Sequence, residues 1–386
     1  MSVHPLPAVP DARADGDLLT TLPRTEATVW LHGDEGLVGR GTAARLDPGV
    51  GAQRFARAAQ DLSAWFDAAP DALAFASFTF DPRSPGSTIV VPEQVLRRRG
   101  AGGTPSGRVR LLHRTSSQTA AWSVSEERWL KAVNAAIGEL RTSGALRKVV
   151  LARDEWVPTP AAVDPRMLVR RLAARFPGCR TFLVDGLVGA TPELLIRRRG
   201  TAVSSLVLAG SAPRAADPGA DARLGAALQT SDKDRVEHRL AVTSVVDALT
   251  PRCRQLVADP EPGLLRLDNV QHLATAVHAT LADPATALEL AGALHPTAAV
   301  CGTPTDLALE RIRTLEGMDR GRYSGPVGWV DAHGDVEFGI ALRCAELTAR
   351  GARLFAGAGI VADSVPSTEL EEVRLKLRAI SDALRG

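Results

Sequence analysis

Lysine is scarce in this chain, which has four lysines against 42 arginines. Arginine stays protonated at any working pH, whereas a buried lysine can lose its proton, so a lysine kept against this bias is a candidate for chemistry. Lysine retained by chance at four positions, without any function, would give the same count. Lys148 favours the functional interpretation, because it lies within the apolar run 148–153, where burying a cation is costly.

Cysteine pairs and long apolar runs are missing as well. The four cysteines are scattered without a CxxC pair, which disfavours a zinc site. No stretch approaches the ~20 apolar residues of a membrane span, and no secretory signal begins the chain, so we expect a cytoplasmic protein with reduced thiols. The net charge of +2 predicts no general attraction to nucleic acid or membranes, and we interpret the arginine triplets 97–99 and 197–199 as solvated strand or loop ends.

Core-forming residues are plentiful, since 45% of the 386 residues are hydrophobic. Residues 1–25, rich in Pro, Ala and Asp, predict a loosely held arm. Hydrophobic spacing predicts strands at 27–31, 36–45, 72–80, 148–153, 181–188, 194–198, 202–208, 325–330 and 337–347, and helices at 55–66, 125–140, 164–175, 221–249 and 367–384. Hairpins mixed with peripheral helices predict an α+β fold with large antiparallel sheets, not a regular βαβ array.

Two of the expected helices carry candidate carboxylates. In the helix 221–249, Glu237 stacks on a column of small side chains that leaves room for a ligand or metal. A surface glutamate explains this pattern equally well. In the last helix Glu369, Glu372 and Lys376 share one stripe, and a solvated pair of Glu372 with Lys376 is the simpler interpretation of that spacing.

Two further segments point to acid–base and anion chemistry. Glu193 follows a proline and precedes an apolar strand, and with Lys148 it makes a candidate acid–base pair, one carboxyl with a raised pKa and one amine with a lowered pKa. The small residues 356–359 predict a turn where backbone N–H groups could approach an anion. They lack the dinucleotide fingerprint and a P-loop lysine, so a carboxylate site with Arg343 as partner is better supported than a nucleotide site.

A dense series of ordered motifs runs from about Trp129 to the C-terminus. It comprises Lys148-Val-Val-Leu-Ala-Arg153, Gly189-Ala-Thr-Pro-Glu-Leu-Leu195, Leu208-Ala-Gly-Ser211, Ser231-Asp-Lys-Asp-Arg-Val-Glu-His238, His272-Leu-Ala-Thr275, His295-Pro-Thr-Ala-Ala-Val-Cys-Gly302, Tyr323-Ser-Gly-Pro-Val-Gly328, Ile340-Ala-Leu-Arg-Cys344 and Ala356-Gly-Ala-Gly-Ile-Val361. These motifs resemble the chorismate-utilising enzymes: isochorismate synthases, salicylate synthases and the large subunits of anthranilate and aminodeoxychorismate synthases. The resemblance implies one chorismate-binding α+β domain over residues 26–386, with its core motifs in 129–386, in which two large antiparallel sheets pack together with helices outside.

Within this family, enzymes that add water carry lysine at the position of Lys148, whereas ammonia users lack it and depend on a glutamine amidotransferase. The runs 295–302 and 327–338 look most like isochorismate synthases. The resemblance therefore implies a monomer that converts chorismate reversibly to isochorismate with Mg²⁺ and no amidotransferase partner. A salicylate synthase, an anthranilate- or aminodeoxychorismate-synthase-like subunit and a non-catalytic chorismate-binding protein are the alternatives. Asp232 and Val236 depart from the family pattern, which bears on metal affinity and rate.

The resemblance also implies roles for individual residues. Lys148, kept neutral, would remove a proton from the water that attacks C2 of chorismate, and Glu193, held protonated, would donate to the departing C4 hydroxyl. Glu237 and Glu372, with Glu369 as a further candidate, would bind Mg²⁺ and anchor the ring carboxylate. The implied substrate-binding positions are Gly210, Ser211, His272, Ala299, Tyr323, Arg343, Gly357 and Lys376.

Overall fold

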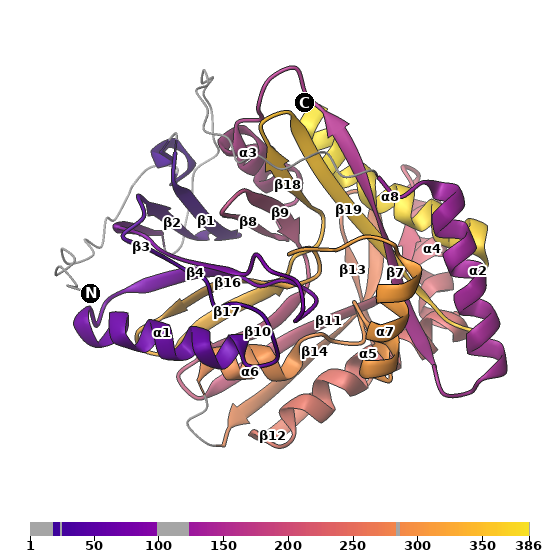
Figure 1. Ribbon diagram of the computed structural model, residues 1–386. Helices are drawn as coiled ribbons and strands as arrows, with labels where there is room; N and C mark the ends of the chain where they lie inside the picture. The colour runs from indigo at the N-terminus through magenta and orange to yellow at the C-terminus, as the bar shows by residue number, and fades with distance from the viewer. Residues whose placement is uncertain (1–17, 24, 99–122, 283–285, 386) are drawn as a thin grey trace.

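The computed structural model describes residues 18–385 except 24, 99–122 and 283–285, and the described residues form two large sheets (Figure 1). The first sheet has the strand order β15 (Gly302–Thr303), β7 (Lys148–Pro158), β19 (Gly351–Ile360), β18 (Cys344–Thr348), β9 (Leu187–Thr191), β8 (Arg180–Val184), β1 (Ala27–His32), β2 (Glu35–Arg40) and β6 (Gln94–Arg98). The second has the order β12 (Cys253–Ala258), β14 (Val270–Leu281), β11 (Ala202–Pro213), β10 (Leu194–Arg199), β17 (Val336–Ile340), β16 (Pro326–Asp331), β4 (Leu73–Ser77), β5 (Thr88–Val91) and β3 (Ala44–Leu46), with β13 (Gly263–Arg266) paired to β14. Neighbouring strands of the described chain run antiparallel throughout.

Helices cover the outer surfaces of these sheets. They are the 3-10 helix η1 (Leu18–Thr21) and the α-helices α1 (Arg54–Ala68), α2 (Glu126–Thr142), α3 (Pro165–Arg175), α4 (Pro218–Thr230), α5 (Asp232–Leu249), α6 (Ala287–Leu294), α7 (Thr305–Leu315) and α8 (Pro366–Arg385). The two helices that matter most for the site are α8, drawn in yellow beside β19, and α5, which packs on β11 (Figure 1). The predicted α+β class, with two large antiparallel sheets and peripheral helices, is confirmed.

Helix starts follow the local capping chemistry. The helix predicted over 164–175 is capped at Asp164, since the Asp164 carboxylate accepts a hydrogen bond from the Arg166 backbone N–H at 3.0 Å and Pro165 takes the first helical position. The single helix predicted for 221–249 is wrong, however. Ser231 leaves the helical conformation and its hydroxyl accepts from the Asp234 backbone N–H at 3.3 Å, so α4 ends there and α5 begins.

Three predicted strands are divided in the structure. The segment 36–45 contains most of β2, in the first sheet, and the first two residues of β3, in the second. The segment 181–188 is a hairpin of β8 and β9, because Asp185 and Gly186 both have positive φ and reverse the chain. The segment 337–347 is also broken, since β17 pairs in the second sheet and β18 in the first. The chain passes between the sheets near Arg343, whose φ is 45°. This crossing places Arg343 at a junction that a periodic pattern does not reveal.

The expected N-terminal arm is anchored at its end. Residues 1–17 lie outside the described part of the chain. Leu18 and Leu19 of η1, together with Leu22, are buried in the main hydrophobic core, so the last part of the predicted loose arm is packed. Burial of three leucines stabilises this contact by several kcal/mol, at about 1.5–3 kcal/mol each.

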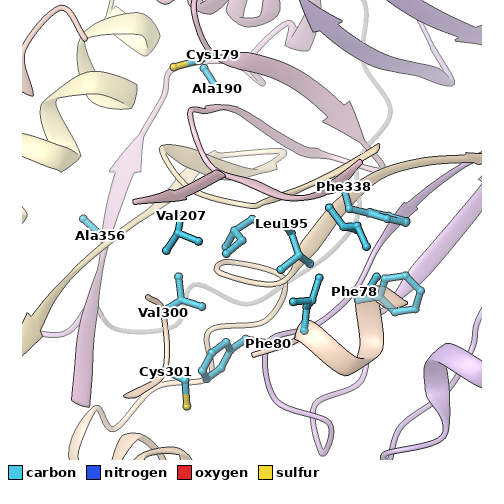
Figure 2. Packing of buried hydrophobic residues seen from close by; sticks show 14 of the residues in the cluster. Phe78, Phe80, Cys179, Ala190, Leu195, Val207, Val300, Cys301, Phe338 and Ala356 are labelled. Carbon is cyan, nitrogen blue, oxygen red and sulfur yellow. The ribbon is translucent and has the colours of Figure 1, made fainter. Parts of the chain in front are cut away.

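The core fills the space between the two sheets (Figure 2). Val188 of β9 and Phe338 of β17 belong to one continuous cluster, which therefore joins both sheets. Phe78 packs edge-on against Phe338, with 6.3 Å between ring centroids, and stacks on Phe55 of α1 at 4.2 Å.

In the described part of the chain no helix is long and apolar enough to cross a membrane.

Candidate active site

Two long neighbouring strands, β7 and β19, form the floor of the candidate site. The small residues 356–359 lie inside β19, where Gly357 pairs with Ala152 and Gly359 with Val150. The turn predicted at these residues is therefore wrong. Their small size serves the approach of a side chain instead, because a Cβ on Gly359 would lie 1.9 Å from Oε1 of Glu237.

Lys148 begins β7 and is completely buried. Its Nζ lies 3.2 Å from Oε1 of Glu237, which is 7% exposed on α5. Within the described chain this amine has no hydrogen-bond partner of acceptable geometry. A buried amine with spare donors is costly, and a ligand or water beside Glu237 would satisfy it.

Glu193 lies between β9 and β10 and is 4% exposed. Burial raises the pKa of its carboxyl from the ordinary 4.5 to about 8, against the opposing effect of the positive charge on Lys148. The sequence could not place these two residues relative to each other. Their electrostatic interaction indicates that the fold brings them together, although β7 and the β9–β10 connection are far apart in the chain.

Arg343 is a buried cation that makes no ion pair with a carboxylate of the described residues. Its Nη2 donates to Nε2 of His272 at 2.6 Å, and its Nε has no hydrogen-bond partner among the described residues. Because arginine can only donate, Nε2 of His272 must accept, which leaves Nδ1–H to face Gly210 O at 3.3 Å and Ser211 Oγ at 3.0 Å. Burial and the Arg343 charge hold the pKa of His272 well below its usual value, consistent with a neutral ring.

Three of the four lysines pair with the three candidate metal-binding glutamates. Lys376 Nζ donates to Glu372 at 2.6 Å and to the Gly357 carbonyl at 3.0 Å. The expected pair of Glu372 with Lys376 is therefore present, but it borders a cavity and is not a freely solvated pair. Lys233 donates to Glu369 at 2.6 Å, and Lys148 faces Glu237.

Lys233 was not among the predicted site residues. The scarcity of lysine in this chain was the signal that could have identified it. Burial and the charge of Glu372 both raise the pKa of Glu369, which is consistent with a crowded group of carboxylates.

The carboxylates suit a metal held jointly with a ligand. Mg²⁺ prefers hard oxygen donors and is commonly bound by one or two protein carboxylates, with waters and ligand oxygens completing the shell. Glu237 and Glu372 both border the cavity. In the described part of the chain no group of three or more His, Cys, Asp or Glu is arranged to hold a metal by itself. The donor set therefore fits Mg²⁺ with an anionic ligand, not an all-protein cage.

One cavity gathers most of the predicted residues. Its wall includes Glu193, Gly210, Ser211, Glu237, His272, Ala299, Tyr323, Arg343, Gly357, Glu372 and Lys376. Lys148 and Glu369 are not on this wall. Lys148 reaches it through Glu237, and Glu369 lies beside it through the shared interaction with Glu372.

Several wall residues escaped the sequence analysis. Ser324 has a φ of 61°, in the left-handed region that non-glycine residues rarely adopt, and such strain concentrates at functional sites. Phe355 stacks on Tyr323 with ring centroids 5.1 Å apart and planes 6° from parallel. This stack fixes the only tyrosine of the chain against the strand that carries Gly357.

The fold and this cavity have clear counterparts among known proteins. The family model of chorismate binding enzymes matches residues 105–385. The chain therefore belongs to the chorismate-binding enzymes.

Within that family the similar proteins include several isochorismate synthases. Isochorismate synthase DhbC of Bacillus subtilis is 45% identical over 253 residues, which cover 62% of this chain and 64% of that protein. Isochorismate synthase EntC of Escherichia coli K12 is 37% identical over 77% of each chain. The structure of MenF, the menaquinone-specific isochorismate synthase of Escherichia coli, matches with a TM-score of 0.79 and 27% identity, covering 97% of this chain and 92% of that one.

Proposed function

We propose that this protein is an isochorismate synthase that converts chorismate reversibly to isochorismate. The observation that carries the proposal is a cavity wall that combines a buried acid, which holds its proton at neutral pH, with Glu237, behind which lies a buried lysine amine with unused donors. The similarity to isochorismate synthases over most of the chain supports the same activity.

Lys148 and Glu193 are assigned the two proton transfers. Lys148 in its neutral form takes a proton from the water that attacks C2 of chorismate, and Glu193 donates its proton to the hydroxyl departing from C4. A pKa of about 8 leaves Glu193 protonated at pH 7, as a donor must be. No proton donor other than this carboxyl is required for the departing oxygen.

Arg343 and its neighbours are assigned the recognition of the enolpyruvyl carboxylate. A buried guanidinium without a counter-ion gains one when a carboxylate binds, and planar forked donors suit that group. The backbone around Gly357 completes this contact. Lys376 lies near the anionic ring, and Ala299 leaves room beside it.

Glu237 and Glu372 are the residues proposed to hold Mg²⁺, with Glu369 as a further candidate. When bound, Mg²⁺ would supply positive charge that neutralises and positions the ring carboxylate. The two carboxylates on the cavity wall support this assignment, since they are donors that Mg²⁺ prefers.

The proposal is tested by incubating the purified protein with chorismate and Mg²⁺ and identifying the products by chromatography. We expect isochorismate at equilibrium with chorismate and no pyruvate. Stoichiometric pyruvate would assign the protein to the salicylate synthases. Anthranilate formed from chorismate and ammonia, without isochorismate, would assign it to the ammonia users.

Four further properties stay predictions from the sequence. They are the organisation of residues 26–386 as one domain, a monomeric state, a cytoplasmic location and independence from a glutamine amidotransferase. Relatives of this chain are named for menaquinone, vibriobactin and salicylate, so the names do not single out one downstream pathway.

A further inference from the structure

The outer edge of β7 loses its neighbouring strand just beyond the catalytic candidate Lys148. β15 has two residues, which pair with Lys148 and Val149, and the Val150 N–H then donates to the Cys301 carbonyl at 2.7 Å. From the Val150 carbonyl onward this edge has no strand beside it in the described chain. Buried backbone groups left unpaired are costly, so something else must pair with them.

An ion pair takes the place of the missing strand. Nη2 of Arg320 donates to the Val150 carbonyl at 2.9 Å, and the Ala152 N–H donates to Oε1 of Glu316 at 2.7 Å. The Arg320 Nε also donates to Oε2 of Glu316 at 2.9 Å. The side chain of Glu316 is 0% exposed and that of Arg320 is 2% exposed.

The same pair extends to two other parts of the cavity wall. Nη1 of Arg320 donates to the Val300 carbonyl at 2.8 Å, next to Ala299. The Arg320 carbonyl accepts from the Tyr323 N–H at 3.1 Å, at the turn that leads to Ser324. Its guanidinium lies over the Phe80 ring at 4.2 Å, and Figure 2 draws Phe80 beside Val300 and Cys301.

We propose that Glu316 and Arg320 are positioning residues of the active site, which hold the strand of Lys148 in register with the wall segments that carry Ala299 and Ser324. Neither residue lines the cavity. Arg320 acts through the backbone of Val150 and Val300, which do line it, and Glu316 acts through Ala152, four positions from Lys148, and through Arg320 itself. Fully satisfied hydrogen bonding lets this buried pair fix a geometry that apolar residues could not specify. The inference deepens the proposed function and rests on it.

The test compares Arg320→Lys with Arg180→Lys. Lysine keeps the charge of Arg320 but cannot reach both carbonyls and Glu316. Arg180 is the matched control, since it is equally buried, pairs with Glu337 at 2.7 Å and does not line the cavity. Melting temperature, kcat and KM for chorismate are measured, with kinetics well below both melting temperatures.

We expect both variants to have a lower melting temperature than wild type. Only Arg320→Lys should lose about 10-fold or more in kcat, because misplacing reacting groups by a fraction of an ångström is enough for such a loss. KM should change by less than about threefold, since Arg343 and Lys376 remain in place. Glu316→Gln keeps an acceptor for Ala152 and should lose kcat in the same sense, and it carries the test if Arg320→Lys does not fold.

Equal kcat in Arg320→Lys and Arg180→Lys, or a rise in KM alone, would overturn the positioning role while leaving the proposed function intact. Wild-type protein that forms no isochorismate in the same assay would overturn both.

Discussion

Lys148 and Glu193 are two buried titratable groups with different neighbours. Glu193 is held protonated by burial, whereas Lys148 faces the carboxylate of Glu237 at 3.2 Å. Their chemistry is therefore set by neighbours from other elements, and single substitutions can separate it from packing.

Replacement of Lys148 by arginine keeps the positive charge but removes the ability to give up a proton. We expect kcat to fall on the order of 10²-fold or more, the usual scale for general acid–base catalysis. The measurement is the initial rate of isochorismate formation. Lys131→Arg is the control, since Lys131 is exposed on α2 and pairs with Glu127, and it should be nearly silent. Comparable activity of the two variants would make Lys148 a structural residue.

The pH dependence of activity should follow the proton on Glu193. This carboxyl must be protonated to donate, and its pKa of about 8 means that the active form persists at neutral pH and is lost as the pH rises through about 8. We expect a descending limb of kcat/KM near pH 8. Glu193→Gln should lose on the order of 10²-fold and with it that limb, whereas Glu127→Gln on the exposed face of α2 should keep both. A wild-type profile that stays flat to pH 9 would contradict the assignment.

Metal dependence should follow Glu237 and Glu372. Glu237→Gln or Glu372→Gln removes a negative oxygen donor, so we expect weaker Mg²⁺ dependence or no turnover while the fold stays intact. The measurements are activity against Mg²⁺ concentration and the circular dichroism spectrum. Normal activity of both variants at low Mg²⁺ would mean that the metal site lies elsewhere. Glu371→Gln, on the exposed side of α8, is a matched control.

At the scale of elements, the pairing of β7 with β19 explains why small residues were confused with a turn. Ala356–Gly359 have turn-like composition, but all four residues pair in register with β7. Composition shows that these positions carry very small side chains or none, but it does not show why they must be small. Here the cause is the approach of Glu237 from α5.

Gly359→Ala should therefore disturb the site without breaking the strand. The added methyl would lie 1.9 Å from Oε1 of Glu237 and 3.1 Å from Cε of Lys148, so the carboxylate must move. We expect a loss of activity on the order of 10²-fold and altered Mg²⁺ dependence, since small displacements of reacting groups have such effects. Gly138→Ala in α2 meets nothing within 4 Å and should be silent or stabilising by about 0.5–1 kcal/mol. Activity in Gly359→Ala equal to wild type would show that Glu237 does not need its present position.

At the scale of the whole molecule, the cavity is assembled from both sheets and two helices. His272 lies in β14 of the second sheet, and Glu193 lies in the connection from β9 of the first sheet to β10 of the second. Gly357 lies in the first sheet and Glu372 on α8. Arg343 lies where the chain passes between the sheets, and its buried charge has no ion-pair partner in the described chain. The folded protein should thus be most stable when an anion occupies this place.

Chorismate should raise the melting temperature of the protein in the presence of Mg²⁺. A ligand at 100 times its Kd stabilises the folded state by about 2.7 kcal/mol. Arg343→Gln removes the buried charge but can still donate to His272, so its ligand-free melting temperature should be no lower than that of wild type, while the shift with chorismate should be lost. Differential scanning fluorimetry provides both values. A full shift in Arg343→Gln would exclude Arg343 from carboxylate recognition.

Features that depend on neighbours close in the chain were predictable from the sequence. The helix at 164–175, the strands at 194–198 and 202–208 and the last helix follow from hydrophobic spacing, and they were predicted. Motif resemblance also supplied the candidate residues, and eleven of them lie on one cavity wall.

Only the tertiary structure decided how those residues meet. The break at Ser231, the crossing of the chain at Arg343 and the place of Gly359 in a strand depend on partners far away in the sequence. The pKa of Glu193 is likewise a property of burial, which no local pattern contains. The same holds for Glu316 and Arg320. They pair with an open edge of β7, and that edge exists only once the sheet is assembled.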